Sequence, residues 1–108
     1  MSRPHRGRSI GCRPHVTFFK PRGVPTSVLR VSRVDLDELE AMRLVDSVGL
    51  HQKEAADRMN VSQSTVARLL ESGRRKVTCA LVGGEALEIQ QGPAPVHFDP
   101  CAEPGENR

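Results

Sequence analysis

Two short amphipathic segments joined by a three-residue turn are the feature that most constrains the fold of this chain. Ala55 and Ala56 are adjacent in the first segment, and side chains this small allow two helices to cross in close contact. Asn60 is one of the few residues other than glycine that tolerate a left-handed backbone, and Ser62 is a preferred N-cap. The pattern predicts a helix-turn-helix, with helices over residues 52–59 and 63–82 and a turn over 60–62.

A third helix is predicted ahead of this pair. Asp35 is a suitable N-cap, and Glu38 three residues later completes a capping box. Asp37 and Glu40 place negative charge at the positive end of the helix dipole, which is the role that we assign to them. Gly49 ends the helix. The apolar positions expected to face the core of the three helices are Leu36, Leu39, Met42, Val45, Ala55, Ala56, Met59, Val66, Leu69, Leu70, Val77, Leu81 and Val82.

The regions outside the helices are rich in Pro and Gly, which exclude a helix through residues 20–26 and favour irregular chain at both ends. Residues 85–90 alternate weakly and fit a short strand. We expect a mainly α fold: a three-helix helix-turn-helix core with short extended or β segments flanking it and disordered ends. Its parts are a flexible basic arm (1–15), an extended or loop segment (16–34), the helix-turn-helix domain (35–91) and a disordered tail (92–108).

The charge of the chain is distributed unevenly. Residues 1–34 hold eight of the sixteen Lys and Arg residues and no Asp or Glu, whereas the remainder holds eight basic and thirteen acidic residues and nets −5. A basic arm ahead of a mildly acidic body fits a polyanionic partner, with a solubilising tail as the alternative. The chain has three Phe and neither Trp nor Tyr, which disfavours single-stranded nucleic acid, whose bases stack on aromatic rings. These features favour double-stranded DNA as the partner.

The outer face of the last helix carries residue types that read base edges, because Gln pairs with adenine, Arg with guanine and Ser with either. We expect base contacts from Gln63, Ser64 and Arg68, with this helix in the major groove. Phosphate contacts are expected from helix starts and a basic cluster, at Gln52, Lys53, Ser62, Thr65, Arg74, Arg75 and Lys76. A solvated face is the alternative for the basic cluster. Arg3, Arg6 and Arg8 of the arm are expected to enter a minor groove.

Three stretches resemble region four of bacterial sigma factors: DELEAMRL at 37–44, QKEAA at 52–56 and VSQSTV at 61–66. The start MSRP, the segment FKPRGVP at 19–25 and the ending ALVGGEAL at 80–87 extend the likeness over residues 1–92. This longer stretch resembles a UPF-type family of small, uncharacterised prokaryotic proteins predicted to bind DNA. The resemblance implies a sigma region four-like helix-turn-helix and a role as a transcriptional regulator. Two residues depart from the pattern, since His51 replaces the common Ser or Thr cap and Asn60 the common Gly.

Other classes of function compete with DNA binding. A metal-responsive sensor would draw its ligands from His5, Cys12, His15, His97 and Cys101, although no spacing among them matches a C-x2-C pair. A protein-interaction module would contact RNA polymerase or another regulator. An enzyme is not expected, because the acidic residues at 37–40 have an ordinary role in capping, and we assign no catalytic residue, metal or cofactor.

Partners and location follow from the same features. A homodimer is expected because one such motif makes few base contacts, and segments 16–34 and 85–90 are candidates for its interface. No apolar run approaches the roughly 18 residues of a membrane span, and the basic N-terminus lacks the apolar run of a secretory signal. We therefore expect a cytoplasmic protein without a membrane partner, in which Cys12, Cys79 and Cys101 are reduced.

Overall fold

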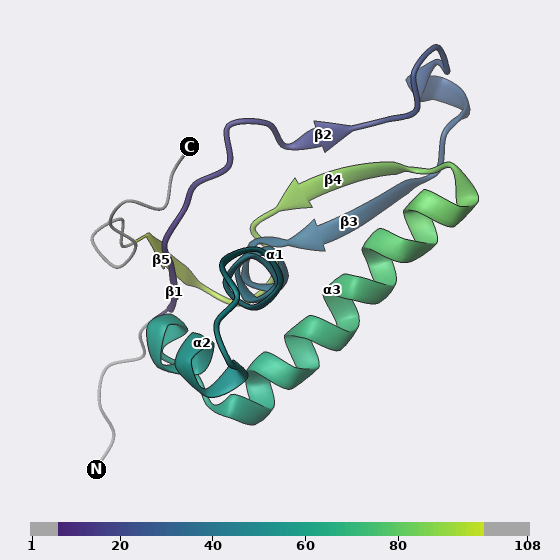
Figure 1. Ribbon diagram of the computed structural model, residues 1–108. Coiled ribbons are helices and arrows are strands. Elements are labelled where there is room, and N and C mark those ends of the chain that lie inside the picture. Colours follow the sequence, from purple (N-terminus) through teal and green to yellow (C-terminus); the bar gives the residue numbers. More distant parts are fainter. Residues whose placement is uncertain (1–6, 99–108) are drawn as a thin grey trace.

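The computed structural model describes residues 7–98, which form three helices and five short strands (Figure 1). The strands are β1 (Arg8–Ile10), β2 (Phe18–Phe19), β3 (Val31–Asp35), β4 (Ala86–Gln90) and β5 (Val96–Phe98). The helices are α1 (Leu36–Met42), which continues as a π-helical stretch η2 (Arg43–Val48), α2 (Gln52–Met59) and α3 (Gln63–Gly83). A 3-10 turn, η1 (Thr26–Val28), lies between β2 and β3. The predicted three helices and the predicted strand at 85–90 are confirmed.

In the sequence, the three helices lie between β3 and β4, two strands that pair with each other. β3 pairs with β4 in parallel, and β2 pairs with β4 in antiparallel, so the sheet order is β2-β4-β3. All three helices are therefore part of the crossover that connects β3 to β4. In Figure 1, α3 runs along this sheet and α1 is seen end-on between the sheet and α2. Ser32 of β3 bonds the carbonyl oxygen of Lys76 at 3.3 Å, which places one face of β3 against α3.

The core lies where the three helices meet. Its buried residues are Ala41, Leu44, Ala55, Ala56, Met59, Val66, Leu69 and Leu70. The residues expected in the core from α2 and from the first half of α3 are all among them. Both alanines are buried, as close helix crossing requires.

Two sets of predicted core residues differ from the structure, one of them only in part. Leu81 and Val82 are 73% and 83% exposed, because the sheet covers α3 only on the side of the buried Ala80. The stripe expected on α1 (Leu36, Leu39, Met42 and Val45) is half-buried, and its Met42 and Val45 pack against the core. The most enclosed side of α1 instead carries Asp37, Glu38 and Glu40, together with Ala41. The periodicity of apolar residues could not reveal this, because the partners of the carboxylates lie far along the chain.

The boundaries expected at both ends of the chain also differ from the structure. Residues 8–10 are not part of a flexible arm and residues 96–98 are not part of a disordered tail, since they form β1 and β5, which pair in parallel. Each strand has only three residues, too few for an alternation of apolar residues to predict it, and each pairs with the other. A Cβ added at Gly7 would lie 2.8 Å from the Pro95 carbonyl carbon, so the two segments approach closely. Residues 1–6 of the predicted arm and 99–108 of the predicted tail lie outside the described residues.

Gly73 marks the crossing of α3 over α1. A Cβ at this position would lie 2.8 Å from Cε of Met42 and 3.2 Å from Cβ of Glu38. We predict that Gly73→Ala destabilises the protein by up to about 2 kcal/mol, because the crowding against Cβ of Glu38, which cannot move without α1, exceeds the gain in helix propensity of about 1 kcal/mol. Urea unfolding measures the change. Gly83→Ala is the matched control, since a Cβ there meets nothing closer than 3.4 Å. A Gly73→Ala variant as stable as the parent would contradict the assigned crossing.

Candidate nucleic-acid interface

The link between α2 and α3 is a tight three-residue turn with a fixed backbone. Asn60 has φ 60° and ψ 45°, the predicted left-handed conformation, and it is the one non-glycine residue with positive φ within residues 7–98. The N–H of Val61 donates to the carbonyl oxygen of Ala56 at 3.1 Å. The Val61 side chain packs against the helical core. These contacts fix the direction in which α3 leaves α2.

The start of α3 is held by a cluster of hydroxyl groups. Ser62 caps the helix as predicted, since its Oγ accepts a bond from the N–H of Thr65 at 3.1 Å. The same oxygen lies 2.8 Å from Oγ1 of Thr65 and 3.1 Å from Oγ of Ser64. Ser62 and Ser64 are exposed, and Thr65 is half-buried. The cluster orients the first turn of α3 and leaves polar oxygen atoms at the surface.

The first two turns of α3 present a polar face to solvent. Gln63, Ser64 and Arg68 are exposed, together with the small Ala67 between them. Val66 is fully buried on the opposite side of the helix. The three residues expected to read bases are therefore brought together on one free face. Arg68 has no ion-pair partner within residues 7–98.

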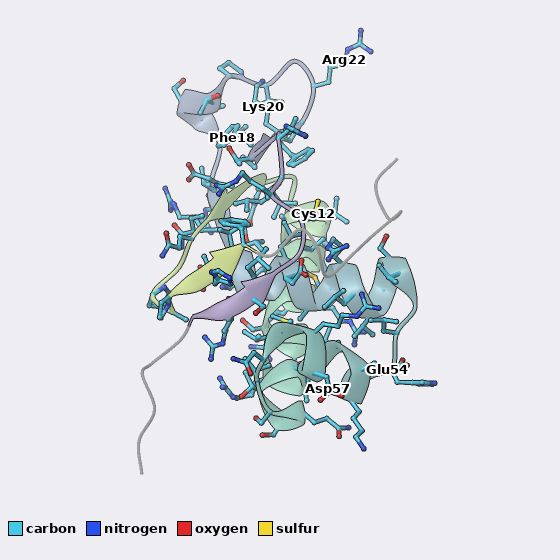
Figure 2. The ribbon with its side chains drawn as sticks, turned by 90° about the vertical axis from the view of Figure 1, so that its left-hand side faces the viewer. Cys12, Phe18, Lys20, Arg22, Glu54 and Asp57 are labelled. Atoms are coloured by element: carbon cyan, nitrogen blue, oxygen red, sulfur yellow. The ribbon has the colours of Figure 1, made fainter. Side chains whose placement is uncertain are left out.

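The start of α2 is less open than the start of α3. Lys53 is exposed and Gln52 is half-buried. His51 anchors this helix although it replaces the common Ser or Thr cap, because the carboxylate of Glu54 accepts a bond from the His51 N–H at 3.0 Å. The exposed side of α2 also carries Glu54 in its first turn and Asp57 one turn later, both labelled in Figure 2. Two carboxylates therefore lie near Lys53 on the exposed side of this helix.

Two of the three cations in the basic cluster of α3 form surface ion pairs. Arg74 makes a bidentate pair with Asp46 of η2, with Nε–Oδ2 and Nη2–Oδ1 distances of 3.1 and 2.6 Å. This pair lowers the pKa of Asp46 and raises that of Arg74. Nη2 of Arg75 lies 3.7 Å from Oε2 of Glu71, and both of these side chains are more than 70% exposed. Arg75 is available to a phosphate, whereas Arg74 must first leave Asp46.

Lys76 does not lie free on the surface as predicted. Its ammonium group binds both carboxylate oxygens of Glu38, at 2.8 and 2.9 Å, and Ser72 donates a further bond to Glu38. The Glu38 side chain is only 5% exposed. The pair ties the middle of α3 to α1, so the ammonium group of Lys76 is held within the fold and is not free to bind a phosphate.

Arg8 also differs from the prediction, which placed it in a DNA minor groove. It belongs to β1, and its guanidinium bonds the buried carboxylate of Asp37 at 2.9 Å. Glu40 accepts a bond from the N–H of Gly11 at 2.8 Å and also binds Arg43. The acidic residues that we assigned to the helix dipole therefore hold the N-terminal strand on α1. Arg8 is not a minor-groove residue, and Arg3 and Arg6 lie outside the described residues.

The two carboxylates beside these cations are shifted in opposite directions. Burial raises the pKa of Asp37, and the nearby Arg8 offsets this only in part. Burial also acts to raise the pKa of Glu38, but the bonds from Lys76, Ser72 and the Asp35 N–H outweigh it and leave the pKa below its ordinary value. The difference follows from the number of donors, because Glu38 accepts bonds from three residues.

These opposite shifts predict opposite dependences of stability on pH. The contribution of Glu38 is fully present above its ordinary pKa of 4.5 and is lost as the pH falls through its lower folded value. Asp37 acts the other way, since its charged form costs stability as the pH rises above 3.8 towards its raised folded value. We predict that Glu38→Gln flattens the acid limb of the stability profile and costs about 1–3 kcal/mol at neutral pH. Urea unfolding from acid to neutral pH measures both.

Asp37→Asn is the matched control for that series. Removing the group with the raised pKa should make the loss of stability in acid steeper, because its opposing contribution is gone. Parallel profiles for the two variants would contradict the assignment of the two carboxylates.

The cysteine and histidine residues do not gather into a metal site within residues 7–98, where no three His, Cys, Asp or Glu side chains could hold an ion together. Cys12 and Cys79 are exposed free thiols. His5 and Cys101, two of the five ligands considered for a metal sensor, lie outside the described residues. The described part of the chain also contains no helix with the length and hydropathy to cross a membrane.

Comparison with known proteins identifies relatives over nearly the whole chain. A UPF0251 protein of Dehalococcoides mccartyi is 43% identical over 103 residues, which cover 95% of this chain and 88% of that protein. UPF0251 proteins of Caldanaerobacter subterraneus and Vibrio vulnificus are 45% and 44% identical, covering 85% and 82% of this chain and 78% and 89% of theirs. No solved structure matches the chain. Residues 1–96 match the family described as protein of unknown function DUF134, and the chain belongs to this family.

Proposed function

We propose that this protein binds double-stranded DNA in a sequence-specific manner and regulates transcription, with α2, the turn and α3 acting as a sigma region four-like helix-turn-helix. The observation that carries the proposal is the exposed polar face at the start of α3, where Gln63, Ser64 and Arg68 lie side by side on a rigidly held helix. Exposure matters here, because a buried hydroxyl group or an arginine held in an ion pair could not bind a base edge. The residue types also fit hydrogen bonding to base edges.

In the proposed complex, the first two turns of α3 lie in the major groove. Arg68 would pair with guanine and Gln63 with adenine, while Ser64 bonds either base. Ser62 and Thr65 would meet a phosphate at the edge of the groove. Lys53, with Gln52 beside it, would contact the backbone across the groove, as helix starts commonly do.

The basic residues of α3 would supply the second part of the affinity. Arg75 extends from the helix one turn beyond the reading face, and its exposed pair with Glu71 contributes little against a phosphate. Arg74 joins it when the DNA competes successfully with Asp46. Phosphate contacts of this kind set the register of the protein on the duplex without reading its sequence.

Arg68→Ala tests the base-reading role. We predict a loss of about 1–3 kcal/mol in affinity and relaxed preference at one base position, measured by selection from a random duplex library followed by titration of the selected site. Affinity of the parent protein for any duplex should fall steeply as salt is raised. Arg22→Ala is the control, since this exposed arginine lies at the opposite end of the molecule (Figure 2).

Two outcomes would count against the proposal. Absence of binding to random duplex DNA at low salt would exclude DNA as the partner. Uniform weakening across all sequences in Arg68→Ala would make Arg68 a phosphate contact and leave the base-reading face unsupported.

Asp46→Asn tests whether Arg74 is a phosphate contact held in reserve. Removing the carboxylate frees the guanidinium, so we predict tighter binding to any duplex and a salt dependence steeper by about one counterion. The same change in an Arg74→Ala background should give no gain, which separates the freed arginine from the mere loss of a negative charge. An equal gain in both backgrounds would show that Arg74 makes no contact.

A second candidate function is favoured by the acidic side of α2. Leu50, Glu54, Asp57 and Arg58 line a shallow depression of about 350 Å³. Acidic residues around an apolar side chain fit a basic protein surface rather than DNA, and RNA polymerase or another regulator would be such a partner. Glu54→Lys with Asp57→Lys should abolish binding to purified polymerase and strengthen binding to DNA. Unchanged polymerase binding would remove this candidate.

A further inference from the structure

The large apolar side chains that are exposed in the described part of the chain gather at one end of it. They are Val16, Phe18, Phe19, Val28, Leu81 and Val82. All belong to the segment around β2 and η1 or to the last turns of α3. Figure 1 shows these parts at the end of the molecule away from α2. A small protein rarely exposes so many apolar side chains in one region unless they bind something.

A groove between β2 and the end of α3 lies within this region. It has a volume of about 320 Å³, and its lining includes Phe19, Lys20, Ala80, Leu81, Glu85 and Leu87. Phe19 is paired with Leu87 across β2 and β4, so both side chains lie on the face of the sheet that α3 covers. Leu81 follows the buried Ala80 and forms the opposite wall. We call this surface the β2–α3 groove.

We infer that the β2–α3 groove is the interface of a homodimer. Its charges are complementary to themselves: Lys20 and Glu85 both line the groove, and neither forms an ion pair with any residue from 7 to 98. Lys20 donates only to the carbonyl oxygen of Val24, at 2.6 Å. A two-fold axis brings the same patch of both copies together. Lys20 of each copy then faces Glu85 of the other, while Leu81 and Phe19 pack across the axis.

The location of the groove allows a dimer to use both reading faces. α3 has 21 residues, so the groove lies about 30 Å along the helix from Gln63. A stable interface takes about 800 Å² from each partner. The exposed Val82 and the free edge of β2 extend the surface that the groove offers to a second copy. The inference goes beyond DNA binding and does not depend on it.

Sedimentation equilibrium of the full chain tests the inference. We expect the parent protein to have twice the mass of the 11.9 kDa chain and Leu81→Glu to have the mass of one chain. Ala67→Glu introduces the same charge on α3 far from the groove and should remain a dimer. A monomeric parent protein, or a Leu81→Glu variant that stays dimeric, would overturn the proposal. Circular dichroism and thermal unfolding confirm that each variant is folded.

Charge reversal identifies the contact and the occupant. Lys20→Glu should weaken the dimer by about tenfold or more, because it places like charges opposite each other twice. Combining it with Glu85→Lys should restore the affinity in purified protein, which only a second copy of the same chain can produce. Failure of the double variant to recover would exclude the two-fold pairing. Because mass is measured without DNA, a dimer that binds no DNA refutes the proposed function alone, and a monomer that binds DNA refutes this inference alone.

Discussion

The burial of carboxylates on α1 is the constraint that organises this molecule. A charge removed from water must find a partner, and α1 buries three. Asp37 and Glu40 recruit β1 and the residues after it, whereas Glu38 recruits the middle of α3. The N-terminal strand and the long helix are therefore fastened to opposite sides of one short helix. Removing one member of such a buried pair costs more than the pair contributes, because the other charge is left without a partner.

Local chemistry made the helical part predictable. The N-cap at Ser62 and the left-handed backbone at Asn60 depend on residue types within a few positions of each other, so both can be predicted from the local sequence. The boundaries of α2 agree with the expectation for the same reason. Gly49 adopts φ 95° and ends η2, which also follows from residue type alone.

The contacts that could not be predicted join residues far apart in the chain. Glu38 and Lys76 are 38 residues apart, and Arg8 and Asp37 are 29 apart. The sequence around each of these residues does not predict which residue it will pair with. The same reason applies to β1 and β5, and to Leu81 and Val82, whose exposure depends on where the sheet ends. Residues 37–40 did carry one sequence signal. Three acidic residues lie within one helical turn, and a helix packed on several sides must bury some of them beside cations. The sequence does not identify which cations these are.

Because the helices are inserted between two adjacent strands, the order of synthesis affects how this chain folds. Arg33 and Glu88, which pair across β3 and β4, are 55 residues apart, whereas all three helices precede β4 in the chain. The helices can therefore assemble on the ribosome while β4 is still within the exit tunnel. Until β4 emerges, β3 has an unpaired edge and Ala80 lacks its cover. β4 thus closes the sheet after the helices have formed, and a chain that ends before β4 retains α3 but leaves an edge of β3 unpaired and open to pairing with other chains.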